Sequence, residues 1–251
     1  FVEGMNAHFA VWRDRTADKL RKLEPGCHPK EIIDDLSEGL LTHYTDKPLL
    51  DQYAVYQHLM DYWAETMQDD CYLIAADGWK AETTRIIEKN KKTGKEKDKG
   101  WTCDLVPKPL IVARFFSNEQ ATLGSRQEDL ETVSASLTEL EEEHGGEDGA
   151  FAELEKINNI EVNKRLKEIK GDPGAKDEIR VLKAWAELNS RLGKIRRAIR
   201  GDEEMIDALA YQKYPELDED EVKTLVIHDK WLATLDAAIH GEMERISQAL
   251  T

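Results

Sequence analysis

Apolar residues recur every three or four positions along most of the second half of the chain. This spacing places them on one face of an α-helix, and such a face must be buried against another element. Four stripes of this kind follow one another, and the last is still running where the sequence stops at Thr251. The pattern therefore predicts helices packed on helices for this half of the chain.

Short turn signals separate the stripes. The first stripe runs from Leu123 to Leu140, and we expect Asp148 to cap a second helix that carries Phe151 to Ile169. Gly171-Asp172-Pro173 combines a helix stop, a cap and a first-turn proline. The third stripe runs from Leu182 to Ile199. We expect a short helix with Met205 to follow and to be broken at Pro215. Asp218 and Glu221 then predict a capping box before the last stripe. Long stripes joined by short turns predict antiparallel helical hairpins.

The first half begins with helical patterns and then changes character. We expect helices over 1–23 and 29–41, and a third that Asp46 caps with Pro48 in its first turn. The runs CYLIAA, TTRIIEK and GWTCDLVPKPLIVARFF between Cys71 and Phe116 predict two or three short strands. The polar, cationic segment Lys89–Gly100 between them reads as a hairpin tip or loop.

These patterns predict a mainly α fold of helical hairpins or a bundle, with long coiled-coil-like helices and a small β excursion around residues 71–116. The expected segments are 1–70, 71–116 and 117–251. Because the chain begins with Phe1 in a helix-like segment and stops in mid-stripe, we expect it to be a fragment of a longer protein.

Composition narrows the classes of function. The chain of 251 residues has a net charge of −16 and 34% charged residues, which argues against a freestanding nucleic-acid binder. Its three cysteines, Cys27, Cys71 and Cys103, have no metal-ligand spacing and fit a reducing compartment. No apolar run approaches the roughly 20 residues of a membrane span. We therefore expect a cytoplasmic location and no membrane partner.

The residues give no catalytic constellation. The seven histidines are scattered along the chain, so capping, packing or solvent contact explains them better than a metal site. We expect no catalytic, cofactor-binding or metal-ligating residue in this chain. An enzyme of unrecognised class remains a minor alternative.

Two basic segments stand out in an acidic chain. One has five cations near the C-terminal end of a predicted helix, where they complement the helix dipole or contact phosphate: Arg191, Lys194, Arg196, Arg197 and Arg200. The other is the polar loop, where Lys91, Lys92 and Lys95 are phosphate candidates. Trp79 and Trp101 bracket this loop, and either pin it or stack on a partner.

Four stretches of the sequence carry a family resemblance that covers most of the chain. They are DQYAVYQHLMDYWAETMQDDCYLIAADGW (51–79), KGWTCDLVPKPLIVARFF (99–116), ELEEEHGGEDGAF (139–151) and KTLVIHDKWLATLDAAIHGEMERISQAL (223–250). Together they resemble the modification (M) subunits of type I restriction-modification systems.

The resemblance implies a DNA adenine-N6 methyltransferase that uses S-adenosylmethionine and flips its target base out of the duplex. The family holds the base with Asn/Asp-Pro-Pro-Phe/Tyr and the cofactor with a Gly-rich motif, but this chain has no adjacent prolines and no F-x-G-x-G. It is therefore similar to the region that follows the catalytic domain, and no cofactor is expected in it.

The resemblance also implies partners. M subunits pair with a specificity (S) subunit, a restriction (R) subunit can join them, and the assembled complex holds DNA. The expected role is docking the methyltransferase to the S subunit; the alternative is a DNA clamp that contacts phosphates through the basic segments. The stripe that would face partner helices comprises Leu232, Leu235, Ile239, Met243, Ile246 and Leu250. Burial of this stripe inside the chain's own bundle is the open alternative.

Overall fold

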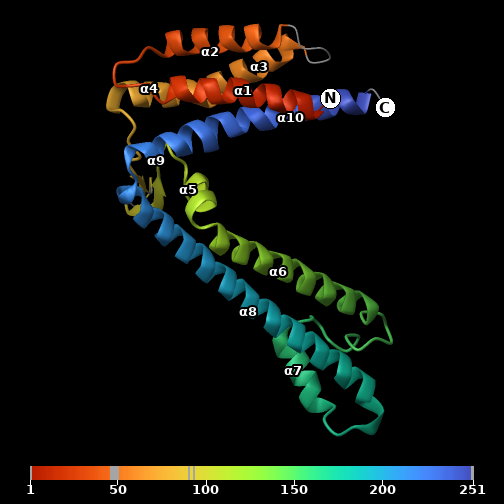
Figure 1. Ribbon diagram of the computed structural model, residues 1–251. Helices are drawn as coiled ribbons and strands as arrows, with labels where there is room; N and C mark the ends of the chain where they lie inside the picture. Colours follow the sequence, from red (N-terminus) through yellow and green to blue (C-terminus); the bar gives the residue numbers. More distant parts are fainter. Residues whose placement is uncertain (1, 46–50, 90, 93, 250–251) are drawn as a thin grey trace. The chain divides into compact units, whose positions relative to one another are not determined.

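The computed structural model describes residues 2–45, 51–89, 91–92 and 94–249 (Figure 1). The fold is mainly α with a small antiparallel sheet, which confirms the predicted class. The elements up to residue 115 are α1 (Val2–Leu20), α2 (Pro29–Tyr44), α3 (Gln52–Tyr62), η1 (Trp63–Met67), α4 (Gln68–Asp77), β1 (Thr84–Lys89), β2 (Glu96–Thr102) and α5 (Lys108–Phe115). They are followed by α6 (Ser117–Glu143), α7 (Asn159–Glu168), η2 (Pro173–Ala175), α8 (Lys176–Lys213), η3 (Tyr214–Glu216), α9 (Glu219–Thr224), η4 (Leu225–Leu232) and α10 (Ala233–Ala249).

The chain divides into two compact units. The first combines Phe1–Phe115 with Ala210–Thr251, and the second is Phe116–Leu209. This division differs from the three consecutive segments expected from the sequence, because the last part of the chain returns to pack with the first. Helix α8 supplies residues to both units.

The first unit has a continuous apolar core. Helix α10 contacts α1 and α3, and η4 contacts α1 and α5 (Figure 1). Large side chains are fully buried there, among them Phe9 from α1, Tyr44 from α2 and Trp231 from η4. The C-terminal stripe therefore finds its apolar partners within the same chain.

Two helices of the first unit each contain a π-helical segment. Segment η1 lies between α3 and α4, segment η4 lies between α9 and α10, and their end residues keep helical backbone angles. A π segment adds a residue to the turn and changes which side chains face the neighbouring helix. Residues Trp63 and Trp231 of these segments are buried.

Two strands form, and one of the three runs expected to contain strands is wholly helical. The run CYLIAA belongs to α4, TTRIIEK supplies all of β1, and the third run begins in β2 with its residues 100–102 and ends in α5 with PLIVARF. Short apolar runs cannot be assigned by periodicity alone when they are buried. In α4 the residues Cys71 and Ile74 face the core, and in α5 Ile111 and Val112 do so.

The segment 89–100 joins the two strands of a hairpin, as predicted, but β2 begins at Glu96, inside this segment. Strand β1 pairs antiparallel with β2 from Thr84↔Thr102 to Lys89↔Glu96, and an irregularity lies between Arg85 and Ile87.

The second unit is a helical hairpin with an added short helix. Helices α6 and α8 run antiparallel, since Arg126 bonds to Asp202 at 2.6 Å and Trp185 donates to Glu141 at 2.6 Å. Its core gathers where the end of α6, α7 and the start of α8 meet: Phe151, Val162, Ile169, Ala175, Val181, Leu182 and Trp185.

The helix stop and cap signals expected in the second unit are confirmed only in part. The Gly171-Asp172-Pro173 signal is confirmed, because Gly171 has φ +91° and Asp172 accepts from the Gly174 amide. The cap predicted at Asp148 is wrong: residues 145–158 form turns and bends, and Asn158 caps α7 by accepting two backbone amides. The expected break before Met205 is also absent, because α8 runs unbroken to Lys213.

At the third helix of the chain, Asp51 is the cap and accepts from the Tyr53 amide. The cap predicted at Asp46 and the first-turn Pro48 lie outside the described residues. The capping box of Asp218 and Glu221 is confirmed in full.

Candidate functional site

The first unit contains a buried ionic cluster that sequence reasoning missed. Asp70 on α4 is only 4% exposed. One of its carboxylate oxygens accepts from the Lys230 ammonium at 2.8 Å, and the other accepts from the Trp231 indole N–H at 2.7 Å. Lys230 and Trp231 both come from the π segment η4.

The lysine of this cluster has further acceptors. Its ammonium donates to the carbonyl oxygens of Leu105 at 3.0 Å and Asp104 at 3.3 Å. The cluster thereby joins α4, η4 and the segment that follows β2. A buried charge is tolerated only when it is paired and hydrogen-bonded, and these contacts meet that need.

Two kinds of effect on the pKa of Asp70 oppose each other. Burial raises the pKa of Asp70 above its ordinary value, while the Lys230 charge and the hydrogen bonds from Lys230 and Trp231 counteract part of the rise. Because both carboxylate oxygens already accept hydrogen bonds inside the protein, the cluster holds segments together rather than presenting a reactive group. The only sequence sign was a charged residue within each of two apolar helical runs.

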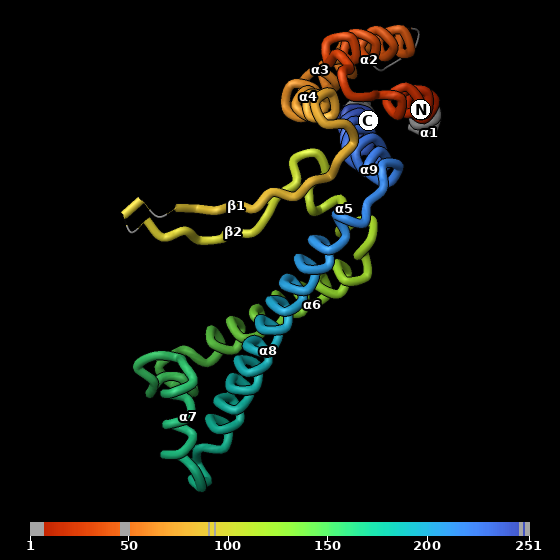
Figure 2. The backbone as a smooth tube through the Cα atoms, turned by 90° about the vertical axis from the view of Figure 1, so that its left-hand side faces the viewer, coloured from red at the N-terminus to blue at the C-terminus, as the bar shows by residue number. Residues whose placement is uncertain are grey.

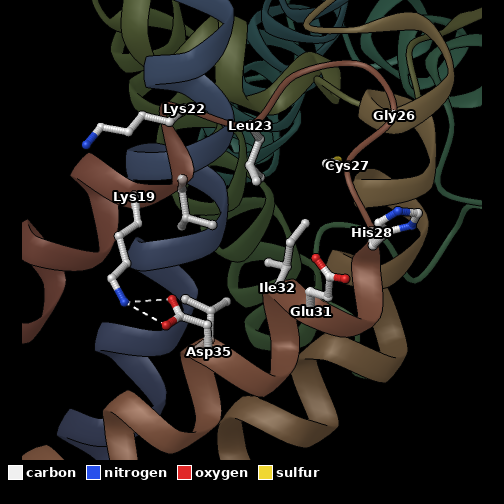
Figure 3. Close-up of a pocket in the computed structure, with 11 residues that line it drawn as sticks. Lys19, Lys22, Leu23, Gly26, Cys27, His28, Glu31, Ile32 and Asp35 are labelled. Atoms are coloured by element: carbon white, nitrogen blue, oxygen red, sulfur yellow. Dashed lines mark hydrogen bonds and ion pairs between the residues drawn. The ribbon is translucent and has the colours of Figure 1, made fainter.

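A pocket of about 580 Å³ lies between the end of α1 and the start of α2 (Figure 3). Leu23 and Ile32 point toward each other in its interior, and the Lys19–Asp35 ion pair of 2.7 Å closes one side. Cys27 is half-buried at the opposite side, and burial raises the pKa of its thiol. A thiol kept protonated is a poor nucleophile, so the pocket has an apolar floor and polar rim without an activated group.

The stripe predicted to face a partner is packed inside the first unit. Leu232, Leu235, Ile239 and Met243 are between 0 and 3% exposed. This corrects the expected open face, because side chains of α1 and α3 already cover the stripe. Leu250 lies outside the described residues, as does the side chain of Ile246.

The basic run lies in the middle of α8. Because the helix continues to Lys213, the expected complement to a helix C-terminus does not apply to this run. Arg191 is paired with Asp129 of α6 at 3.9 Å, and the Arg197 guanidinium donates to the Gly193 carbonyl oxygen at 3.2 Å. Arg191 and Lys194 line a surface hollow of α8.

An open groove of about 670 Å³ runs beside α6 in the second unit. Its lining combines small or apolar residues with acidic ones and a single arginine from α8: Leu130, Glu131, Ser134, Ala135, Thr138, Glu139, Glu142 and Arg196. Leu130 remains half-buried, although it belongs to the apolar stripe of α6. The α6 groove is therefore a surface where the packing of the seam is incomplete.

The two tryptophans that bracket the hairpin act as pins. Trp79 is 7% exposed, and its indole N–H donates to the Leu23 carbonyl oxygen at 2.8 Å. Trp101 packs against the rings of Tyr211 and Tyr214 at 5.4 and 5.1 Å. Both contacts fit the loop-pinning interpretation.

Within the described part of the chain, no group of three or more His, Cys, Asp or Glu side chains is placed to hold a metal ion. No helix in those ranges is both long and apolar enough to cross a bilayer. No protein-family model, curated protein or solved structure matches the chain.

Proposed function

We propose that this chain is the C-terminal assembly region of the modification subunit of a type I restriction-modification system. In this proposal it docks the DNA adenine-N6 methyltransferase to the S subunit in the cytoplasm, and an R subunit joins the complex. The proposal assigns S-adenosylmethionine to the catalytic domain of the parent protein and no cofactor to this chain. The sequence resemblance over four stretches supports it.

The observation that carries the docking proposal is the α6 groove. The stripe on α6 buries Leu123 and Val133, and its Leu137 and Leu140 pack against the core of the second unit, but Leu130 is only half-buried and lines the groove. A helix laid into this groove would complete the seam, as amphipathic helices do in hydrophobic grooves. The burial of the C-terminal stripe moves the proposed partner face from α10 to α6.

Co-purification with the cognate S subunit tests the proposal. A helical seam should survive high salt, whereas an electrostatic contact should weaken steeply. The variant Ala135→Arg places a long cation inside the groove and should weaken the complex at least about tenfold, as expected for a disrupted interface centre. Ala121→Arg is the matched control, because it is exposed on the same helix roughly 21 Å away and does not line the groove.

Each result has a distinct meaning. A stable complex that neither variant weakens would place docking elsewhere on the chain and remove the groove assignment. Failure to co-purify at either salt concentration would overturn the docking proposal itself.

A second candidate function is a DNA clamp. Two observations favour it: the basic run is not explained by a helix end, and the β1–β2 hairpin is cationic in an acidic protein. Docking and DNA contact are compatible, and they separate by salt dependence. Binding to duplex DNA that is lost between about 50 and 200 mM salt would support the clamp, and the absence of duplex binding would refute it.

A further inference from the structure

The β1–β2 hairpin is exposed on both of its faces. Every described residue from Thr84 to Lys99 is exposed, including Ile86 at 44% and Ile87 at 52%. Figure 2 shows the two strands leaving the helices of the first unit as a separate ribbon. Since little of it is buried, most of the hairpin does not serve the core.

The charge of the hairpin is opposite to that of the chain. Residues 84–102 contain seven Lys and Arg and three Asp and Glu, which gives +4, whereas the whole chain carries −16. The excess is concentrated toward the tip, where Lys91, Lys95 and Lys97 accompany Glu96. A cationic projection on an acidic protein attracts polyanions.

Cross-strand ion pairs keep the ribbon in register. Arg85 bonds to Asp98 at 2.6 Å, and Lys99 bonds to Glu88 at 2.9 Å. A third pair joins Lys89 to Glu96 at 3.8 Å near the tip. These three pairs use every acidic residue of the hairpin, so its positive excess comes from the lysines between 91 and 97.

Aromatic residues fix the base of the ribbon. Trp101 stacks on Tyr211 and Tyr214, and the Tyr214 hydroxyl donates to the Val106 carbonyl oxygen at 2.6 Å. The Arg85 guanidinium lies 5.7 Å from the centre of the Tyr211 ring. These contacts attach an otherwise exposed hairpin firmly to the first unit.

We propose that the β1–β2 hairpin binds duplex DNA, with its strands in the major groove and its tip lysines on the phosphates. A two-stranded ribbon fits the roughly 12 Å wide major groove of B-form DNA, whereas the major groove of A-form RNA is too narrow to admit it. The inference rests on the DNA contact of the second candidate function and is independent of docking.

Fluorescence anisotropy with a labelled duplex of about 20 base pairs tests the inference on the whole chain. The hairpin variant is Lys91→Gln, Lys95→Gln and Lys97→Gln. At about 50 mM salt it should bind at least about tenfold more weakly than the unmodified protein, and its salt dependence should be shallower by about 2.7 in log–log slope.

A matched control changes the same net charge elsewhere. Lys167→Gln, Lys170→Gln and Lys176→Gln alter three exposed lysines of the second unit, and this variant should stay within about twofold of the unmodified protein. Circular dichroism should show that both variants keep their helices. Equal losses of affinity in the two variants would show that net charge alone determines DNA binding, and this result would overturn the inference.

A third variant tests whether duplex DNA is bound by the hairpin or by the basic run of α8. If Arg196→Gln, Arg197→Gln and Arg200→Gln abolish duplex binding while the hairpin variant binds normally, the DNA clamp stands and the hairpin inference fails. If the unmodified protein binds no duplex, both fail and docking is unaffected. Equal affinity for the single strand of the same length would overturn the groove placement.

Discussion

The first unit is closed by side chains from opposite ends of the sequence, whereas the second is built from one continuous stretch of the chain. Asp70 and Lys230 are 160 positions apart, while the Arg126–Asp202 pair of the second unit spans 76. Among the largest fully buried side chains of the described residues, Leu182 alone belongs to the second unit. A deep core that needs distant segments is cooperative, and a long hairpin with a thin core leaves apolar surface for partners.

The strongest test of this contrast is to break the buried ion pair. Lys230→Met leaves the Asp70 carboxylate buried without its cation, so we expect the free energy of unfolding to fall by about 3–5 kcal/mol. Urea unfolding followed by tryptophan fluorescence measures the loss.

A surface pair is the control for this change. Lys19→Met removes the exposed Lys19–Asp35 pair and should cost less than about 1 kcal/mol. The double variant Lys230→Met with Asp70→Leu should recover much of the loss, since it removes both charges. A cost for Lys230→Met no greater than that of the control would show that the cluster does not hold the first unit together.

The next test compares cavities in the two cores. Leu225→Ala empties a fully buried site of η4 and should cost about 2–5 kcal/mol, whereas Leu130→Ala trims a half-buried residue of α6 and should cost about 1 kcal/mol. Hydrogen exchange of peptides from each unit measures the two effects separately. Equal losses of protection would contradict the idea that the second unit has the thinner core.

A smaller effect is expected where the hairpin is removed. Replacing residues 86–99 by a short Gly-Ser turn deletes exposed strands only, so the free energy of unfolding should change by roughly 0.5 kcal/mol or less. Thermal unfolding by circular dichroism measures this change. A loss of several kcal/mol would mean that the ribbon has a structural role in the first unit.

The smallest effect is a pH dependence in η4. Burial and the charge of Arg21 lower the pKa of His228 below its ordinary value of 6.5. The unfolded chain therefore takes up a proton on this residue before the folded chain does as pH falls. The contribution of His228 to the free energy of unfolding is therefore full above pH 6.5, and it declines as the pH falls from 6.5 to the lowered pKa of the folded state.

The variant His228→Gln isolates that dependence. Between pH 7.5 and 5.5, measured by urea unfolding, the unmodified protein should lose stability relative to the variant. A gain for the unmodified protein on acidification would reverse the sign and rule out the lowered pKa.

Local features of the fold could be predicted from the sequence, because their causes are local. The capping box at Asp218 and the stop at Gly171 depend on a few adjacent residues, and both are confirmed. The run CYLIAA failed as a strand because a short buried apolar run has no visible period. The break predicted before Met205 failed because a single Gly201 costs a helix only about 1 kcal/mol.

Tertiary features were beyond the sequence pattern. The stripe from Leu232 to Met243 predicted a buried face correctly, but an apolar face does not say whether its cover is another chain or its own. The contact of Asp70 with Lys230 joins two runs whose local patterns carry no sign of each other. Pairings across such separations are set by the packed fold.

The return of the last segment to the first unit has a consequence for biosynthesis. Ribosomes add roughly 5–20 residues per second, so about 7–27 s pass between the synthesis of Phe115 and that of Ala249. During this interval α1 to α5 have been made without η4 and α10, and the surface that these elements cover stays open. The local hairpin of the second unit can fold meanwhile. Nascent chains stalled before residue 225 should therefore bind chaperones through the first unit, and release should follow completion of α10.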